Sequence, residues 1–125
     1  MVNRRGFTLI ELLVVMAIIA TLLTIALPRY FGSVEKSKEV TLRQSLSVMR
    51  DAIDKFYADN GRYPDKLDEL AEKRYIRAVP VDPITASAST WVVVPSPDSA
   101  AKGAVYDVKS GAEGKASDGK PFAEM

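Results

Sequence analysis

Residues 6–27 read GFTLIELLVVMAIIATLLTIAL, an apolar run in which Glu11 is the only ionisable side chain. A helix rising about 1.5 Å per residue over this run would cover roughly the 30 Å hydrocarbon thickness of a bilayer. A carboxylate in such a segment is costly and usually marks a partner or a function. Since the run contains no Lys or Arg, the charge of Glu11 must be met from outside this helix. The alternative is a plain single-pass anchor that tolerates a glutamate near the membrane surface.

The residues before the run predict its orientation. Arg4 and Arg5 stand directly before it, and basic residues favour the cytoplasmic side of a membrane. The leader MVNRRG is too short and too polar for a secretory signal peptide, which carries its cleavage site after the apolar core. We therefore expect a cytoplasmic N-terminus and a head on the outer side.

The start of the chain also resembles a known signal. A basic leader, Gly6, Phe7, Glu11 four residues later, an apolar span and then Pro28 resemble the class III signal of type IV pilins and type II secretion pseudopilins. The resemblance implies that a prepilin peptidase cleaves between Gly6 and Phe7, that Phe7 is N-methylated, and that the apolar helix is retained.

The same resemblance implies a partner for Glu11. Cleavage would create an ammonium at Phe7, which in this family pairs with the glutamate of a neighbouring subunit as the filament grows. An ion pair at low dielectric is favourable mainly relative to leaving either charge unpaired. We therefore interpret Phe7 and Glu11 as assembly residues that set the register between subunits.

The helix is predicted to continue beyond the apolar run. Pro28 removes a backbone donor and predicts a kink or local break, although it could instead end a membrane helix. An apolar stripe at helical spacing then favours continuation to about Asp59, with Asn60 and Gly61 as the end signal. The stripe consists of Leu42, Leu46, Met49, Ile53 and Phe56. We expect it to pack against the protein's own sheet rather than form a coiled coil.

Short elements are predicted for the remainder. Residues 57–64 (YADNGRYP) and 75–86 (YIRAVPVDPITA) resemble the corresponding loops of the major, G-type pseudopilins. Pro64 is expected to open a short helix over PDKLDELAEKRY, and the prolines of residues 75–86 predict an extended, turn-rich connection. Residues 91–94 and 104–108 are predicted strands joined antiparallel by a loop.

These elements predict an α+β, pilin-like fold in which a long N-terminal helix packs against a small antiparallel sheet. The expected segments are a leader (1–6), a membrane or filament-core helix (7–27), its amphipathic continuation (28–60) and a small periplasmic head (61–125).

Composition argues against several functions. The 125 residues contain no Cys and no His, which removes cysteine nucleophiles, zinc thiolate sites and the commonest general base. We therefore expect no enzyme activity and no catalytic residues. The 17 basic and 16 acidic residues are nearly balanced and give no footprint for nucleic acid.

The C-terminal tail holds the only metal candidates. The corresponding loop of G-type pseudopilins binds calcium, and this tail contains the acids Glu113, Asp118 and Glu124, of which Glu113 and Asp118 are the weak calcium candidates. Calcium takes six to eight oxygens. The pair of acids expected near the end of the chain falls on Lys120 and Pro121, and a lysine would repel the ion. We expect a solvated tail and no cofactor.

Taken together, the resemblance implies a pseudopilin subunit anchored in the inner membrane. Its expected partners are further copies of itself in a helical filament, prepilin peptidase, an inner-membrane assembly platform and minor pseudopilins. The filament would be a pseudopilus that drives type II secretion. Two alternatives stay open: a type IV pilin, although the paired cysteines common in pilins are absent, and a non-polymerising single-pass protein with a small binding head.

Overall fold

A computed structural model describes residues 6–125 and divides them into two compact units, the first ending at Glu35 and the second comprising residues 36–125. The leader arginines Arg4 and Arg5, on which the predicted orientation depends, lie outside the described residues.

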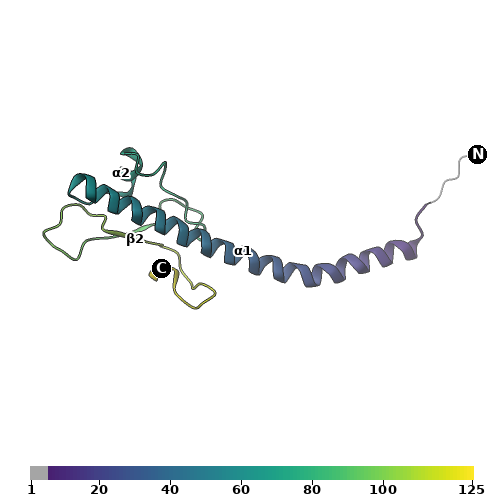
Figure 1. The fold of residues 1–125 in the computed structure, drawn as a ribbon. Helices are drawn as coiled ribbons and strands as arrows, with labels where there is room; N and C mark the ends of the chain where they lie inside the picture. The colour runs from purple at the N-terminus through teal and green to yellow at the C-terminus, as the bar shows by residue number, and fades with distance from the viewer. Residues whose placement is uncertain (1–5) are drawn as a thin grey trace, which may run out of the picture. The chain divides into compact units, whose positions relative to one another are not determined.

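Helix α1 (Leu9–Asn60) is the longest element, with 52 residues (Figure 1). It passes through Pro28, so this proline does not end it, and the kink predicted there stays a prediction. The predicted end signal is confirmed. Gly61, with φ +69°, donates its N–H to the Tyr57 carbonyl at 2.8 Å, closing the last turn in a left-handed conformation suited to glycine.

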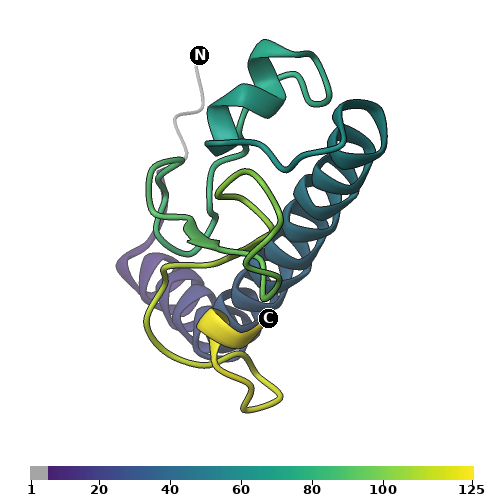
Figure 2. The same cartoon turned by 90° about the vertical axis from the view of Figure 1, so that its left-hand side faces the viewer.

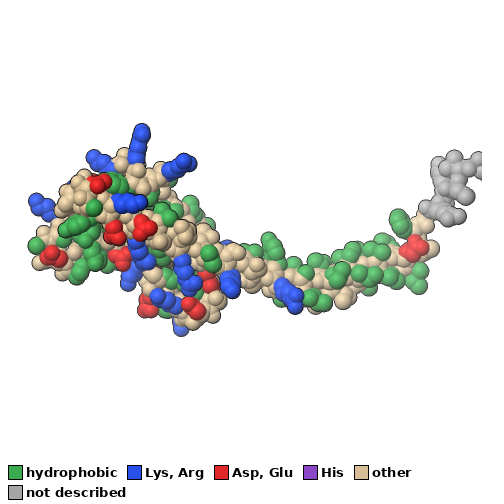
Figure 3. Space-filling view, viewed as in Figure 1, with side chains coloured by type: hydrophobic (Ala, Val, Ile, Leu, Met, Phe, Trp, Pro, Cys, Tyr) green, Lys and Arg blue, Asp and Glu red, His purple; other side chains and the backbone are tan. Residues whose placement is uncertain are grey.

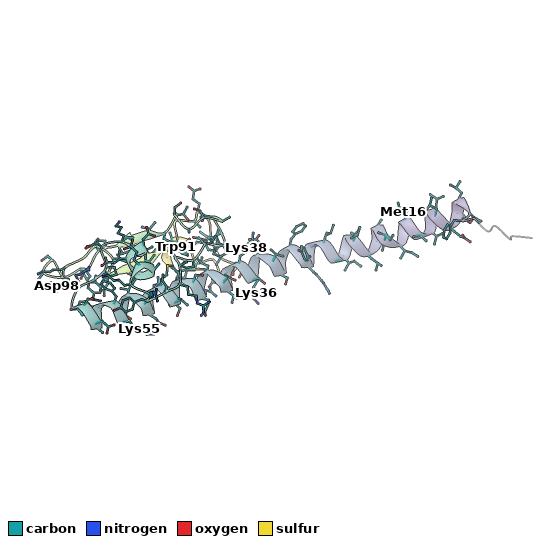
Figure 4. The ribbon with its side chains drawn as sticks, turned by 90° about the horizontal axis from the view of Figure 1, so that it is seen from above. Met16, Lys36, Lys38, Lys55, Trp91 and Asp98 are labelled. Atoms are coloured by element: carbon teal, nitrogen blue, oxygen red, sulfur yellow. The ribbon has the colours of Figure 1, made fainter. Side chains whose placement is uncertain are left out.

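In the first unit, α1 exposes its apolar side chains on all sides. Hydrophobic side chains cover much of the visible face of this part of α1 in Figure 3, and Met16 projects from it in Figure 4. By length and composition, α1 is apolar enough to cross a membrane. Among the large apolar residues exposed here are Leu9, Ile10, Leu12, Leu13, Val14, Val15, Met16, Ile18, Ile19, Leu22, Leu23, Ile25 and Leu27.

In the second unit, the apolar stripe of α1 is buried in the core of the head. Leu42, Leu46, Met49, Ile53 and Phe56 are each no more than 1% exposed, which confirms the predicted stripe. Trp91, labelled in Figure 4, is also buried and donates its indole N–H to the Pro80 carbonyl at 2.8 Å. The other buried hydrophobic residues are Ala52, Leu67, Leu70, Val105, Val108, Ala112, Ala116, Phe122 and Met125.

Helix α2 (Leu67–Glu72) begins three residues later than the sequence predicts. Pro64 was expected to open the helix, but its carbonyl accepts hydrogen bonds from the N–H groups of Ala104 and Val105 at 3.1 and 2.9 Å. That carbonyl is therefore engaged by the chain before β2 and does not start the helical ladder. Leu67 and Leu70 are buried in the core.

Strands β1 (Val92–Val94) and β2 (Asp107–Lys109) form an antiparallel pair, with Val93 opposite Val108. The antiparallel arrangement confirms the predicted α+β fold. The second strand is shorter and later than predicted, because Val105 bonds to Pro64 instead of to β1. A 3-10 turn, η1 (Phe122–Glu124), ends the described chain, and Figure 2 shows this C-terminal segment in yellow beside α1.

The turn-rich connection between α2 and β1 is fixed by one buried acid. Asp82 is fully buried, and its carboxylate accepts the Ile84 N–H at 2.8 Å and the Ser110 hydroxyl at 2.5 Å. Such a side chain mimics a backbone turn partner. The contact with Ser110 ties this connection to the residue that follows β2.

The buried stripe predicts a large effect of truncation. Leu46→Ala should lower the free energy of unfolding of the head by about 2–5 kcal/mol, because it removes buried methyl groups and leaves a cavity. Denaturant unfolding of the full chain in detergent, followed by Trp91 fluorescence, measures this change. Val48→Ala is the control: Val48 lies on the same helix but is 42% exposed, so its effect should stay within about 0.5 kcal/mol. Equal effects of the two variants would contradict the packing described here.

Candidate functional site

The first turn of α1 forms a capping box. Thr8 precedes the helix, and its hydroxyl accepts the Glu11 N–H at 3.1 Å. The Glu11 carboxylate reaches back and accepts the Thr8 N–H at 3.3 Å. This reciprocal pair satisfies two backbone donors that the helix leaves without intrahelical partners.

The sequence contained the signal for this cap, in the tetrapeptide Thr8-Leu9-Ile10-Glu11, which matches the capping-box pattern. Sequence reasoning instead treated Glu11 only as a charge in need of a partner. The structure gives Glu11 a second role within its own helix. Its negative charge also lies near the positive N-terminal end of the helix dipole, an attraction that favours an acid in the first turn.

The residues of the predicted processing site lie directly before the cap. Gly6 and Phe7 are outside α1 and exposed, with Phe7 at 93%. Glu11 is exposed as well. The arrangement therefore leaves the peptide bond between Gly6 and Phe7 open, and it keeps the Glu11 carboxylate within one helical turn of it.

A second polar cluster fixes the exit of α1 into the head. Arg62 donates to a Glu69 carboxylate oxygen at 2.5 Å, and its guanidinium carbon lies 5.1 Å from the centre of the Phe56 ring. Glu69 also accepts the Asp65 N–H at 2.8 Å. The hydrogen bond from Arg62, followed by the one from the Asp65 backbone, lowers the pKa of the Glu69 carboxyl below its ordinary value.

Three tyrosines surround this exit. Tyr57 and Tyr63 stack with ring centroids 4.5 Å apart, and Tyr106 meets Tyr63 edge-on at 5.2 Å. Gly103 passes so close that a Cβ there would lie 2.0 Å from the Tyr63 carbonyl oxygen. The tyrosines therefore join the end of α1 to the chain before β2.

The two calcium candidates are not brought together as a site. Glu113 is exposed, and Asp118 pairs with Arg43 of α1 at 3.0 Å. Within residues 6–125, no three His, Cys, Asp or Glu side chains lie close enough to hold a metal ion.

Comparison with known proteins places this arrangement in a family. Residues 1–27 match the prokaryotic N-terminal methylation motif. The chain is 31% identical over 99 residues to the type II secretion system core protein G of Klebsiella pneumoniae, covering 66% of this chain and 71% of that protein. The chain belongs to the type II secretion core protein G family. The corresponding protein of Escherichia coli strain K12 is 30% identical over 97 residues, covering 65% of this chain and 67% of that protein.

A pilin matches a shorter region. The type IV major pilin protein PilA of Myxococcus xanthus strain DK1622 is 38% identical over 68 residues, which covers 54% of this chain and 31% of that protein. No solved structure matches the chain. Family membership and the methylation motif give the chain a pseudopilin role, and the apolar α1 makes it a membrane-anchored subunit.

The Arg62–Glu69 contact predicts a pH dependence. Because the folded pKa of Glu69 is lowered, the stability it contributes is present above the ordinary glutamate value of 4.5 and is lost as pH falls through the lower folded pKa. Glu69→Gln should therefore flatten the acid limb of the stability–pH curve of the head. Thermal melts between neutral and acid pH measure it, with Glu72→Gln as control on the same helix. An unchanged acid limb in Glu69→Gln would contradict this role.

Proposed function

We propose that this chain is processed by a prepilin peptidase and polymerises into a pseudopilus that drives type II protein secretion. The observation that carries the proposal is the first turn of α1, where Glu11 lies one turn after an open Gly6–Phe7 bond on a helix with exposed apolar sides. That surface is unstable in water, so it needs lipid before assembly and other subunits after it.

Cleavage between Gly6 and Phe7 would leave Phe7 as the new N-terminus, with its amine methylated. The methylated amine remains cationic at neutral pH and so keeps its attraction for a carboxylate. Thr8 then becomes the second residue of the processed chain, and the capping box stays complete because neither of its members is removed.

The proposed role of Glu11 combines capping with pairing. Its Oε2 atom accepts the Thr8 N–H, and a carboxylate has further lone pairs to accept from a cation. The ammonium of Phe7 in a neighbouring subunit would supply that cation. Burying the two charges as a hydrogen-bonded pair costs less free energy than burying either charge alone. Only one axial register between subunits brings the two charges together, so the pair would select that register.

The membrane topology follows the same scheme. The N-terminus would lie in the cytoplasm, α1 would cross the inner membrane once, and the head would lie in the periplasm. The expected partners are further copies of the chain, the assembly platform in the inner membrane, and minor pseudopilins. Its role would be structural, without catalysis.

A surface pilus is the second candidate, favoured by the match to the Myxococcus xanthus pilin. That match is confined to 68 residues, whereas the secretion proteins match over 97–99 residues. The longer similarity supports the secretion role. A non-polymerising anchor with a small binding head is the third candidate. The exposed apolar surface of α1 would suit any helix in a lipid bilayer, so it does not favour this candidate over a filament subunit.

Processing is tested by changing Gly6. Gly6→Leu should leave the precursor uncleaved, because a bulky side chain would stand beside the bond to be cut. Intact-mass spectrometry of membrane fractions with and without the peptidase distinguishes the two forms. Gly32→Leu is the matched control, since Gly32 lies inside α1 and an added side chain there meets nothing within 4 Å. A processed N-terminus other than Phe7 would refute the assignment.

Two substitutions separate capping from charge. Glu11→Gln keeps a capping oxygen but removes the charge, whereas Thr8→Ala removes the cap hydroxyl and keeps the charge. We expect Glu11→Gln to insert and be processed normally but to lose most filaments. Thr8→Ala should reduce assembly less, since losing a cap costs about 1 kcal/mol. Filament yield by shearing and electron microscopy is the measurement. Normal filaments from Glu11→Gln would refute the pairing role.

A further inference from the structure

The C-terminal segment of this chain is built differently from a calcium loop. Calcium takes six to eight oxygen ligands at about 2.3–2.6 Å. Both oxygens of Asp118 are already engaged: Oδ2 pairs with Arg43 at 3.0 Å, and Oδ1 accepts the Lys120 N–H at 3.0 Å. An ion placed there would have to displace the Arg43 guanidinium. The residues present do not fit calcium.

The segment nevertheless has a defined local structure. Residues 115–121 form a tight loop, closed by a bridge between Lys115 and Pro121 and by the Ala116 N–H, which donates to the Lys120 carbonyl at 2.9 Å. Gly119 turns the chain with φ +85°, a conformation that suits glycine. The tip of the loop, Ser117 and Asp118, points at α1, to which both residues bond.

The main contact of this tip is with Glu39 of α1. Glu39 is only 7% exposed, which is unusual for a glutamate unless its oxygens are satisfied. Its Oε1 accepts the Ser117 N–H at 2.7 Å, and its Oε2 accepts the Ser117 hydroxyl at 2.8 Å. Both carboxylate oxygens are thus used to hold one residue of the loop.

Two arginines of α1 extend the contact along the helix. Arg43, one turn after Glu39 on the same face, pairs with Asp118. Arg50 donates to the Asp107 carboxylate at 2.8 Å and to the carbonyls of Val108 and Met125 at 3.0 and 2.7 Å. The helix therefore binds the segment at its loop and at its last described residue. Between these contacts, Ala116 and Phe122 are buried in the core.

We propose that Glu39, Arg43 and Arg50 of α1 fasten residues 115–125 to the head and replace the calcium ion that the family resemblance implies. We call this set of three side chains the helix clasp. It makes the folded head independent of calcium. This inference concerns the stability of the single subunit and goes beyond the proposed role in the filament.

The contacts made by Arg43 and by Glu39 differ in strength. Arg43 and Asp118 are 50% and 54% exposed, so water and salt screen their attraction. The Asp118 pKa is lowered, chiefly by the Lys120 N–H and then by Arg43, so Asp118 stays ionised at neutral pH. Glu39 is buried, and removing one partner of a buried charged hydrogen bond leaves the other unsatisfied. Glu39 should therefore contribute more to the clasp than Arg43.

Hydrogen exchange of the full chain in detergent tests the clasp. In Glu39→Gln, the side-chain amide has only one oxygen, a weaker acceptor than a carboxylate oxygen. One of the two Ser117 donors therefore faces an amide nitrogen and loses its acceptor. We expect exchange of residues 114–122 to accelerate by roughly tenfold or more, while α2 keeps its protection. Arg43→Gln should have a smaller effect. Glu113→Gln is the matched control, because Glu113 is an exposed acid of the same tail. Unchanged tail exchange in Glu39→Gln would overturn the clasp.

Ser117→Ala covers the case in which Glu39→Gln unfolds the whole head. It removes only the hydroxyl donor and keeps the N–H that bonds to Glu39, so a smaller acceleration confined to the same segment is expected. An acceleration spread evenly over the head, or none, would count against the proposal.

Calcium titration tests the second half of the inference. A ligand that binds only the folded state raises the melting temperature. Since we expect no calcium to bind, the melting temperature of the full chain should differ by less than about 2 °C between chelator and millimolar calcium. Calcium should also fail to slow tail exchange in Glu39→Gln. A larger rise that Glu113→Gln abolishes would show a calcium site and overturn the proposal. Both readouts use the unassembled subunit, so they are independent of whether it forms a pseudopilus.

Discussion

The apolar surface of α1 is the constraint on which the rest of the structure depends. In its first half, apolar side chains face every direction and remain exposed, with 93% exposure at Phe7 just before it and 45% at Leu27. In its second half, one apolar stripe is buried by the head, while Val40 and Val48 off the stripe stay exposed. The same helix therefore requires two environments: lipid or neighbouring helices for the first half, and the chain's own loops for the second.

The small head that covers the second half of α1 contains little regular secondary structure. Its two strands have three residues each, so few of its backbone groups are satisfied by a sheet. Backbone bonds in the turns and side-chain hydrogen bonds hold the rest of the head. Asp82 holds the turns before β1, Arg62 and Glu69 hold the exit of α1, and the helix clasp holds the C-terminal segment. In the part of the chain that the structure describes, no buried side-chain polar atom lacks a hydrogen-bond partner. This matches the low tolerance of interiors for unpaired polar groups.

Periodicity and end signals were sufficient to predict the helix. The spacing of Leu42, Leu46 and Phe56 identified the buried face, and Asn60-Gly61 identified the end, because both depend on local geometry alone. The start of α2 and the extent of β2 were predicted less well. Both depend on the Pro64 carbonyl, which bonds to residues forty positions away, and no local pattern encodes such a contact.

The site shows the same division between local and distant information. Glu11 was identified from its chemistry, and its capping partner Thr8 was encoded within four residues but overlooked. The tail acids were predicted to be a poor calcium set, because Lys120 stands where the resemblance implies an acid. Their actual partners could not be predicted. No local pattern distinguishes Glu39 from the other charges of α1, and only the fold places Ser117, 78 residues later, against it.

In the proposed filament, Glu11 meets the N-terminal ammonium of Phe7 across a subunit boundary. Electron cryomicroscopy of filaments assembled from the processed chain measures this contact directly. The Phe7 nitrogen should lie within about 4 Å of the Glu11 carboxylate of a neighbouring subunit, the distance of an ion pair. A filament in which Glu11 caps its own Thr8 while the Phe7 nitrogen lies beyond the Debye length of about 10 Å from every Glu11 would contradict it.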